Sequence, residues 1–255
     1  MSTGLVYLHC ALQASRRPVL RGRWPHMPGG GPPRPVPVDG DLWAIVSTVP
    51  EDVYGETSVA ARLSDVDWLS ACGGAHHAVI ARAGRRRSVV PFRLLTLFRS
   101  QARAVEEVRR LRGPLVRALA RVAGRDEWVL RAMAEAPRAA APPRRAQSGT
   151  AYLLARADAP GRPIGLAAAR RAVGQMAADV ARRADAVERR RADATLPHVL
   201  YDATLLVARR RRIELQATVR RWSTRLASSG ARLSLTGPWP PYSFVTLSTR
   251  SSGRG

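Results

Sequence analysis

Cysteine and histidine side chains come close together in one short segment, where they could bind a metal ion. Cys72 and His76 are four residues apart, so on a helix they would share one face, and His77 follows directly. A structural zinc site needs two more ligands, and the chain has only two cysteines and five histidines, with no second pair. A histidine that packs or caps its helix is therefore favoured, and we predict neither a metal nor a cofactor.

The sequence likewise shows no pattern typical of a catalytic nucleophile or of a catalytic pair of carboxylates. No serine lies in a Gly-x-Ser-x-Gly nucleophile elbow. The paired carboxylates Glu106-Glu107 and Asp126-Glu127 are sequence neighbours, and consecutive residues of a helix do not face each other. We predict that the chain has no catalytic residue and is not an enzyme.

Arginine supplies the whole basic charge of the chain. There are 42 arginines and no lysines against 19 acidic residues, which gives a formal net charge of +23. Such an excess directs attention to nucleic acid, an anionic membrane or an acidic protein as the partner. The lack of lysine and asparagine is typical of a GC-rich genome. Codon usage explains arginine in place of lysine, but only part of the excess of basic residues.

Four arginine clusters could contact phosphates or carboxylates: residues 85–87, Arg109 with Arg110 and Arg112, residues 189–191 and residues 209–212. Recognition of single strands would also need an aromatic stacking platform, but the three phenylalanines and five tyrosines are scattered. We expect nucleic acid to bind only non-specifically, at low salt, and keep an arginine-rich nucleic-acid-binding protein as the alternative. Acidic protein surfaces are favoured, because guanidinium groups pair bidentately with carboxylates.

Membrane and secretory classes are not indicated. No apolar run approaches the roughly 18 residues that a membrane-spanning helix needs. The first residues lack the basic and long apolar regions of a secretory signal, and Cys10 and Cys72 make no disulfide framework. We predict a cytoplasmic protein with no membrane partner.

The first half of the chain must supply the elements that position these side chains. Prolines and glycines make residues 24–37 a loop with polyproline II character. Gly73-Gly74 should interrupt or bend a helix that is capped at Ser64, and Gly113-Pro114 should break a second helix. Extended segments are expected at residues 4–12, 42–49 and 88–98, and helices at residues 64–83 and 105–122.

The second half mixes strands and helices without regular repetition, which predicts the α+β class. Residues 136–148, rich in alanine, proline and arginine, should form a linker or long loop. Apolar residues from Leu166 to Val187 recur at steps of three and four; this stripe either packs on its own sheet, which is favoured, or forms a coiled-coil seam. Strands are expected at residues 127–133, 152–154, 199–207 and 232–235, and helices at residues 166–191 and 213–226.

The C-terminal motif Gly237–Val245, GPWPPYSFV, combines a stiff backbone with large aromatic side chains. Its prolines lower the entropy lost when the aromatic residues are ordered, and tryptophan and tyrosine make good interface anchors. The motif could bind a partner, or it could fold back and bury its aromatic rings in its own domain. Both alternatives remain open at this point.

The same motif, together with Thr236, resembles the terminal signature of the gas vesicle protein GvpL/GvpF family. Leu95 stands where that family usually has glycine, and Thr150 where it usually has arginine. Weaker landmarks occur in the family's order at Leu42–Pro50, Asp67-Trp68-Leu69 with Ala75-His76, Val89–Arg93 with Thr96 and Phe98, Glu127-Trp128, and Gly149–Leu153.

The resemblance implies two domains: an N-terminal α+β domain, set at residues 1–125, and a modified ferredoxin-like antiparallel sheet with added helices, set at residues 126–255. It implies a non-enzymatic accessory or minor structural protein, associated with gas vesicles, that binds the shell protein and other accessory proteins during nucleation and assembly. The candidate partner-binding or family-motif residues are Gly237, Pro238, Trp239, Pro240, Pro241, Tyr242, Phe244, Pro91, Arg93, Trp68 and His76.

Overall fold

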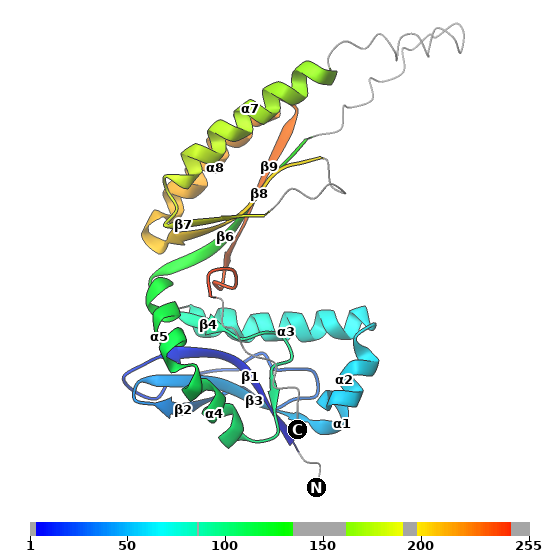
Figure 1. Cartoon of the computed structure of the whole chain (residues 1–255), viewed down its shortest axis with the longest axis vertical. Helices are drawn as coiled ribbons and strands as arrows, with labels where there is room; N and C mark the ends of the chain where they lie inside the picture. Colours follow the sequence, from blue (N-terminus) through cyan, green and yellow to red (C-terminus); the bar gives the residue numbers. More distant parts are fainter. Residues whose placement is uncertain (1–3, 86, 135–161, 191–197, 246–255) are drawn as a thin grey trace, which may run out of the picture. The chain divides into compact units, whose positions relative to one another are not determined.

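The computed structural model describes residues 4–85, 87–134, 162–190 and 198–245, with no side-chain description for residues 162–165. These residues form two compact units. The first contains the residues up to Asp126 together with the segment that begins at Trp239, and the second spans Glu127–Pro238 (Figure 1). The C-terminal motif, assigned above to the C-terminal domain, therefore divides after Pro238. The expected loop 136–148 and the segment Gly149–Leu153, with the strand at residues 152–154, lie outside the described residues.

The first unit is built around one antiparallel sheet whose centre is β1 (Gly4–Gln13). The strand order is β2 (Arg34–Asp39), β3 (Leu42–Pro50), β1, β4 (Val89–Pro91), and the short β5 (Leu97–Phe98) also pairs with β1. Every residue of β1 from Leu5 to Leu12 is buried, because α3 (Val66–Gly84) covers one face of the sheet, and α4 (Gln101–Arg110) and α5 (Arg112–Arg121) cover the other (Figure 1). The two predicted strands at residues 4–12 and 42–49 are confirmed.

Residues 34–37 were expected to continue the proline-rich loop, and this was wrong. They begin β2, in which Pro35 pairs with Ile45 and Pro37 with Trp43. Because β2 is the outer strand, a proline can lack its N–H on the open side without losing a ladder hydrogen bond. Val36 and Val38, which alternate with the prolines, are buried in the core.

The helix expected from Ser64 to about residue 83 differs at its start and in its middle. Its N-cap is Asp65, whose carboxylate accepts a 3.0 Å hydrogen bond from the backbone N–H of Trp68. The helix runs through Gly73-Gly74 without interruption to Gly84. Two helical glycines cost about 2 kcal/mol together relative to alanine, and the burial of side chains such as Val79 and Ile80 on the sheet offsets that cost. Two short helices, α1 (Glu51–Tyr54) and α2 (Glu56–Arg62), precede it.

The predicted break between α4 and α5 is confirmed, but it falls at Leu111, before the glycine and the proline. Pro114 then lies in the first turn of α5, where a missing N–H breaks no helical hydrogen bond. Leu111, Leu115 and Leu119 are buried core residues of this part of the chain.

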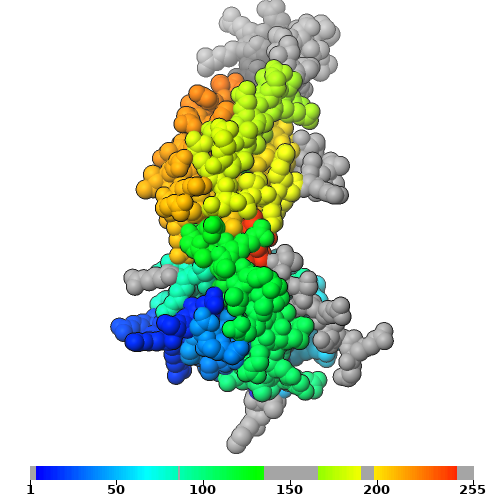
Figure 2. Space-filling view, turned by 60° about the vertical axis from the view of Figure 1, so that its left-hand side comes forward, coloured from blue at the N-terminus to red at the C-terminus, as the bar shows by residue number. Residues whose placement is uncertain are grey.

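Within the described residues, the second unit has the β-α-β-β-α-β element order of a ferredoxin-like fold. Its described elements are β6 (Arg125–Ala134), α7 (Arg162–Ala181), β7 (Ala186–Arg189), β8 (Val199–Ala208), the 3₁₀ turn η1 (Arg209–Arg211), α8 (Arg212–Ala227) and β9 (Ala231–Trp239). The strand order is β7-β8-β6-β9, and α7 and α8 lie side by side on one face (Figure 1, Figure 2). The α+β class predicted from the sequence is confirmed.

The long helix expected at residues 166–191 ends at Ala181, and residues 186–189 form β7 instead. Val187, the last member of the apolar stripe, pairs with Leu205 of β8. The last step of the stripe, from Ala184 to Val187, is three residues long. That spacing is compatible with one more turn of helix and also with a turn followed by a strand, so the apolar spacing alone could not distinguish the two structures. The helical part of the stripe, including Val173 and Met176, packs on the sheet of its own unit, as favoured above.

Candidate functional site

The C-terminal motif begins with a glycine that no other residue could replace without a clash. Gly237 has a φ of 139°, and a Cβ atom added there would lie 2.9 Å from both the carbonyl oxygen of Glu127 and the indole ring of Trp128. Both the backbone conformation and the close approach therefore require glycine. Gly237 and Pro238 belong to the second unit, whereas the residues from Trp239 onward belong to the first.

The rest of the motif packs on the first unit with its aromatic rings in two environments. Pro240, Pro241 and Phe244 are buried, and the guanidinium of Arg121 lies 5.9 Å from the centre of the Phe244 ring. Trp239 and Tyr242 stay 39% and 38% exposed. The alternative in which the motif folds back on its own protein is thus realised for Phe244, whereas partner binding through Trp239 and Tyr242 stays a prediction.

His77 of α3 holds the two exposed rings. Its imidazole lies 5.2 Å from the Trp239 ring in an edge-on arrangement, and its Nδ1 lies 3.3 Å from the hydroxyl of Tyr242. Burial lowers the pKa of His77, which favours the neutral imidazole that can accept the hydroxyl proton. The two exposed aromatic rings are therefore both in contact with the same residue of α3.

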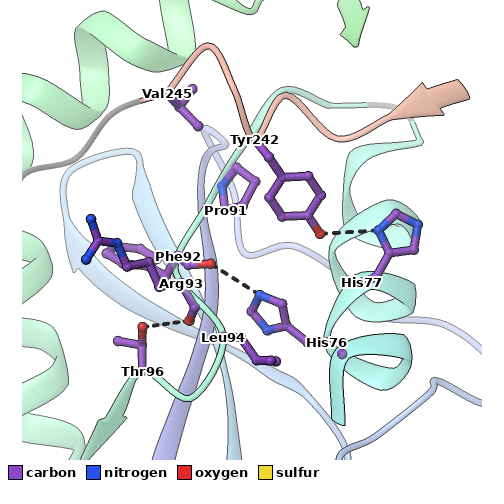
Figure 3. Close-up of a pocket in the computed structure, with 10 residues that line it drawn as sticks. His76, His77, Pro91, Phe92, Arg93, Leu94, Thr96, Tyr242 and Val245 are labelled. Atoms are coloured by element: carbon purple, nitrogen blue, oxygen red, sulfur yellow. Dashed lines mark hydrogen bonds between the residues drawn. The ribbon is translucent and has the colours of Figure 1, made fainter. Parts of the chain in front are cut away.

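A cavity of about 570 Å³ is lined by Tyr242 and His77, together with eight other residues (Figure 3). Three stretches that are far apart in the sequence form its walls: one turn of α3, the segment after β4, and the C-terminal motif. The residues that line it are Gly73, His76, His77, Pro91, Phe92, Arg93, Leu94, Thr96, Tyr242 and Val245. Among these lining residues there is no aspartate or glutamate, and Arg93, whose side chain is exposed, is the arginine among them.

A chain of hydrogen bonds fixes the floor of the cavity. The N–H of Leu95 donates to the hydroxyl oxygen of Tyr7, and that hydroxyl lies 3.1 Å from Nδ1 of His76. The other ring nitrogen, Nε2, lies 3.2 Å from the carbonyl oxygen of Phe92. A neutral imidazole protonated at Nε2 satisfies both contacts, so His76 joins α3 to the segment after β4.

Leu95 supports this network from a strained backbone conformation. Its φ is 62°, in the left-handed region that glycine adopts most easily and that costs other residues about 1–2 kcal/mol. A glycine, which the family resemblance implies at this position, would avoid that cost. The Leu95 side chain is half-buried and packs against the core cluster that contains Tyr7.

We therefore expect the Leu95→Gly variant to be more stable than Leu95→Ala by about 1 kcal/mol, because both remove the side chain and only glycine relieves the backbone. Urea unfolding followed by circular dichroism measures the difference. Leu94 is the control, since its φ is not positive. There the alanine variant should be the more stable one, and the same order at both positions would contradict the strain at Leu95.

The cavity gathers some of the predicted site residues and leaves out others. Pro91, Arg93, His76 and Tyr242 line it. Trp239 is not a lining residue, but its ring contacts that of His77, which is one. Pro240, Pro241 and Phe244 are buried residues of the same segment. Trp68 lies elsewhere: its ring packs 5.8 Å from that of Tyr54, under the guanidinium of Arg62. Gly237 and Pro238 belong to the second unit.

Several lining residues were not predicted as site residues, among them Gly73, His77, Leu94, Thr96 and Val245. The spacing of Gly73, His76 and His77 was a usable signal, since positions i, i+3 and i+4 share one helix face. Nothing in the sequence indicated that the segment after β4 would meet that face.

Cys72 and His76 do share a face of α3, but each has a partner within the protein. The Cys72 sulfur lies 3.7 Å from the hydroxyl of Tyr54, and both ring nitrogens of His76 are engaged as described. Within the described residues, no group of three or more histidine, cysteine or acidic side chains is placed to hold a metal ion. No helix in this part of the chain is long and apolar enough to cross a membrane.

Comparison with known proteins gives consistent matches along the chain. The family model described as gas vesicle synthesis protein GvpL/GvpF matches residues 5–246. Gas vesicle protein L of Streptomyces sp. (strain CB03234) is 34% identical over 259 residues, which cover 90% of this chain and 91% of that protein.

Two crystal structures share the fold. Gas vesicle protein GvpF from Anabaena sp. PCC7120 aligns with a TM-score of 0.66 and 14% identity, over 96% of this chain and 97% of that one. GvpF from Microcystis aeruginosa aligns with a TM-score of 0.65 and 15% identity, over 96% of this chain and 100% of that one. At these identities the likeness is one of fold.

Proposed function

Because the chain belongs to the gas vesicle GvpL/GvpF family, we propose that it is a non-enzymatic accessory or minor structural protein of gas vesicles that binds the shell protein, and other accessory proteins, during nucleation and assembly. The observation that supports this most directly is the pair of exposed rings Trp239 and Tyr242, which both contact His77. Tyr242 and His77 also line the cavity that α3, the segment after β4 and the C-terminal motif form together.

The aromatic pair has the properties of an interface anchor. Tryptophan and tyrosine are enriched among the residues that dominate binding energies, and more than a third of each residue is still exposed for a partner to cover. The buried prolines Pro240 and Pro241 and the contacts with His77 hold the two rings in place before a partner arrives. Little conformational entropy is then lost on binding. A hydrophobic shell protein is a suitable partner for such a surface.

The arrangement of arginines supports a protein partner over single-stranded nucleic acid. Stacking of bases needs exposed aromatic rings, but most of the rings that lie near a guanidinium are also buried in the core. The pairs of guanidinium and ring are Arg62 with Trp68, Arg82 with Trp24, Arg189 with Tyr201, Arg212 with Trp128, and Arg225 with Trp222. The remaining positive charge favours encounter with an acidic protein surface and predicts strong salt dependence.

We expect the double variant Trp239→Ala, Tyr242→Ala to capture the host's shell protein at least about thirtyfold more weakly than the wild type, because two anchor rings are lost. Pull-down with the purified full chain measures capture, and electron microscopy of the host shows whether vesicles are absent or deformed. Leu63→Ala is the control, since Leu63 is exposed but lies outside the cavity and the motif.

Capture of the shell protein by the double variant at the wild-type level would contradict the anchor role. Normal vesicles in a host from which the gene is deleted would contradict the proposed function as a whole. Tight binding of generic duplex DNA at physiological salt would instead favour the nucleic-acid alternative.

A further inference from the structure

The turn of α3 that lines the cavity has a gap where a side chain would ordinarily stand. Gly73 lies one helical turn before His76 and His77, on the same face, and it is one of the lining residues. A Cβ atom added at Gly73 would meet no other atom within 4 Å, so it would project into open space. Glycine inside a helix costs about 1 kcal/mol relative to alanine, and neither the packing of the chain nor a positive φ requires it here.

The walls beside this gap are apolar on most sides and positive on one. Pro91, Phe92, Leu94 and Val245 contribute apolar surface. Figure 3 shows the guanidinium of Arg93 on the side of the cavity where Val245 lies, with His77 and Tyr242 on the opposite side. Arg93 is exposed, and its carbonyl oxygen accepts a 2.7 Å hydrogen bond from the Thr96 hydroxyl, which closes the turn that carries it.

This combination selects a specific kind of ligand. A cavity of about 570 Å³ is within the range of pockets that enclose a small molecule or a few side chains. Its apolar walls favour an aliphatic or aromatic side chain, and its cation, with no acidic group among the lining residues, favours a carboxylate within reach of Arg93. A neutral apolar peptide would leave the arginine without a partner carboxylate, and a purely acidic one would leave the apolar walls uncovered.

We propose that the cavity is a socket for a segment of the vesicle shell protein in which an apolar side chain stands next to an aspartate or glutamate. Gly73 keeps the socket open, and Arg93 pairs with the carboxylate. This proposal rests on the proposed function, and it adds to the aromatic anchor a second contact that recognises the charge pattern of the partner.

The gap in the helix provides a test that leaves the fold intact. Gly73→Leu fills the socket, and Gly74→Leu is its matched control: the next residue of the same helix, exposed, outside the lining, and equally free of atoms near an added Cβ. Both variants should fold at least as stably as the wild type, because each replaces a helical glycine. We expect Gly73→Leu to lower the affinity for the shell protein at least about tenfold and Gly74→Leu to leave it within about twofold.

The charge requirement is tested separately. Arg93→Gln should weaken capture about tenfold at low salt, whereas Arg99→Gln, an exposed arginine outside the cavity, should not. The probes are the intact shell protein and overlapping peptides of about 15 residues that cover it. Peptides with an apolar residue beside a carboxylate should bind, and their amide versions, with Asn or Gln in place of Asp or Glu, should bind about tenfold more weakly.

The outcomes separate this inference from the proposed function. If the wild type captures the shell protein and Gly73→Leu captures it as well as Gly74→Leu does, the socket is wrong and the function stands. Equal binding of the acidic and amide peptides would overturn the carboxylate requirement. If the wild type captures no shell protein at all, the proposed function fails, and the socket fails with it.

Discussion

Replacing Asp179 with alanine is expected to lower the free energy of unfolding of the second unit by about 3 kcal/mol. Asp179 lies on α7 and is only 9% exposed. One carboxylate oxygen accepts hydrogen bonds from Arg182 and Arg183 at 2.7 and 2.6 Å, and the other accepts from the indole N–H of Trp222 at 2.8 Å and from Arg221 at 3.1 Å. A single carboxylate thus joins α7 to α8.

The size of the effect follows from what is left without a partner. Trp222 is buried, so its N–H would lose its acceptor without gaining water, and the mostly buried Arg183 would lose its closest carboxylate. Arg182 and Arg221 have side chains that are more than half exposed and can hydrate, which keeps the cost near the low end of the usual range for a broken buried ion pair. The Trp222 hydrogen bond, followed by those from Arg183 and Arg221, holds the pKa of Asp179 down at about 2.

Urea unfolding, with hydrogen exchange to identify the affected segments, measures this prediction. Exchange should accelerate in α7 and α8 of the Asp179→Ala variant. Asp179→Asn keeps an acceptor for Trp222 and should cost about half as much. The control is Glu106→Ala, which breaks an exposed pair with Arg103 and should change stability by less than about 1 kcal/mol. Equal effects of the Asp179 and Glu106 variants would mean that the carboxylate does not join the two helices.

Local patterns predicted the elements of this fold well where spacing and end signals agree. Residues 42–49 are apolar and β-branched and stop at Pro50, and they form β3. The spacing of Leu215, Val219, Trp222 and Leu226 predicts α8, and those side chains are buried on the sheet. The predictions failed where a tertiary contact decides between two local structures. Pro35 lies in a strand rather than a loop because β2 pairs with β3, and Val187 lies in a strand rather than a helix because β7 pairs with β8.

The candidate site was less accessible to such patterns. The rigid aromatic character of the C-terminal motif was visible in the sequence, but its burial against α3 depends on contacts across more than 160 residues, such as His77 with Tyr242. Gly73 was interpreted as a helix breaker, because a glycine signals weak helix propensity and cannot by itself signal a cavity. The space around it becomes apparent only when the segment after β4 and the C-terminal motif are in place.

The first unit is expected to lose stability steeply in mild acid, by about 5 kcal/mol between pH 7 and pH 4.5. Two stacked imidazoles cause this. His9 is fully buried and His76 is 4% exposed, with 5.7 Å between their ring centres. His9 Nε2 lies 3.0 Å from the Ser47 hydroxyl, and its Nδ1 is buried with no hydrogen-bond partner among the described residues. A proton added to either ring would place a charge in the core, where neither histidine forms an ion pair with a carboxylate of the described residues.

The sign follows from the pKa values of the folded and unfolded states. Burial, and then the neighbouring His76, lowers the pKa of His9 to about 3, and burial lowers that of His76 to about 4 against the opposing Phe92 carbonyl. In the unfolded chain both titrate near pH 6.5, so below that pH the unfolded state binds more protons than the folded state. Stability is therefore fully present above about pH 6.5 and is lost as the pH falls toward 4. Each histidine contributes about 2.5 kcal/mol at pH 4.5.

The slope of the unfolding free energy against pH is the measurement that isolates these histidines. Between pH 4.5 and 5.5 the two together should contribute about 2.5 kcal/mol per pH unit, and His9→Gln or His76→Gln should each remove about half of that, even if the variant is less stable at pH 7. Leu63→Ala, at an exposed position of the same unit that does not titrate, should leave the slope unchanged. An unchanged slope in both core variants would rule out the buried pair as its cause.

The two units should also respond to acid in a definite order. The second unit depends on Asp179, whose low pKa keeps its carboxylate charged at pH 4.5. In the first unit, by contrast, the unfolded state binds protons at that pH that the buried histidines of the folded core exclude, so unfolding is favoured. Hydrogen exchange at pH 4.5 should therefore show lost protection in β1 and α3 while α7 and α8 stay protected. The opposite order would mean that the hydrogen bonds around Tyr7, His9 and His76 tolerate a proton. Such tolerance would require the Tyr7 hydroxyl to find an acceptor other than His76, which its contact with the Leu95 N–H does not provide.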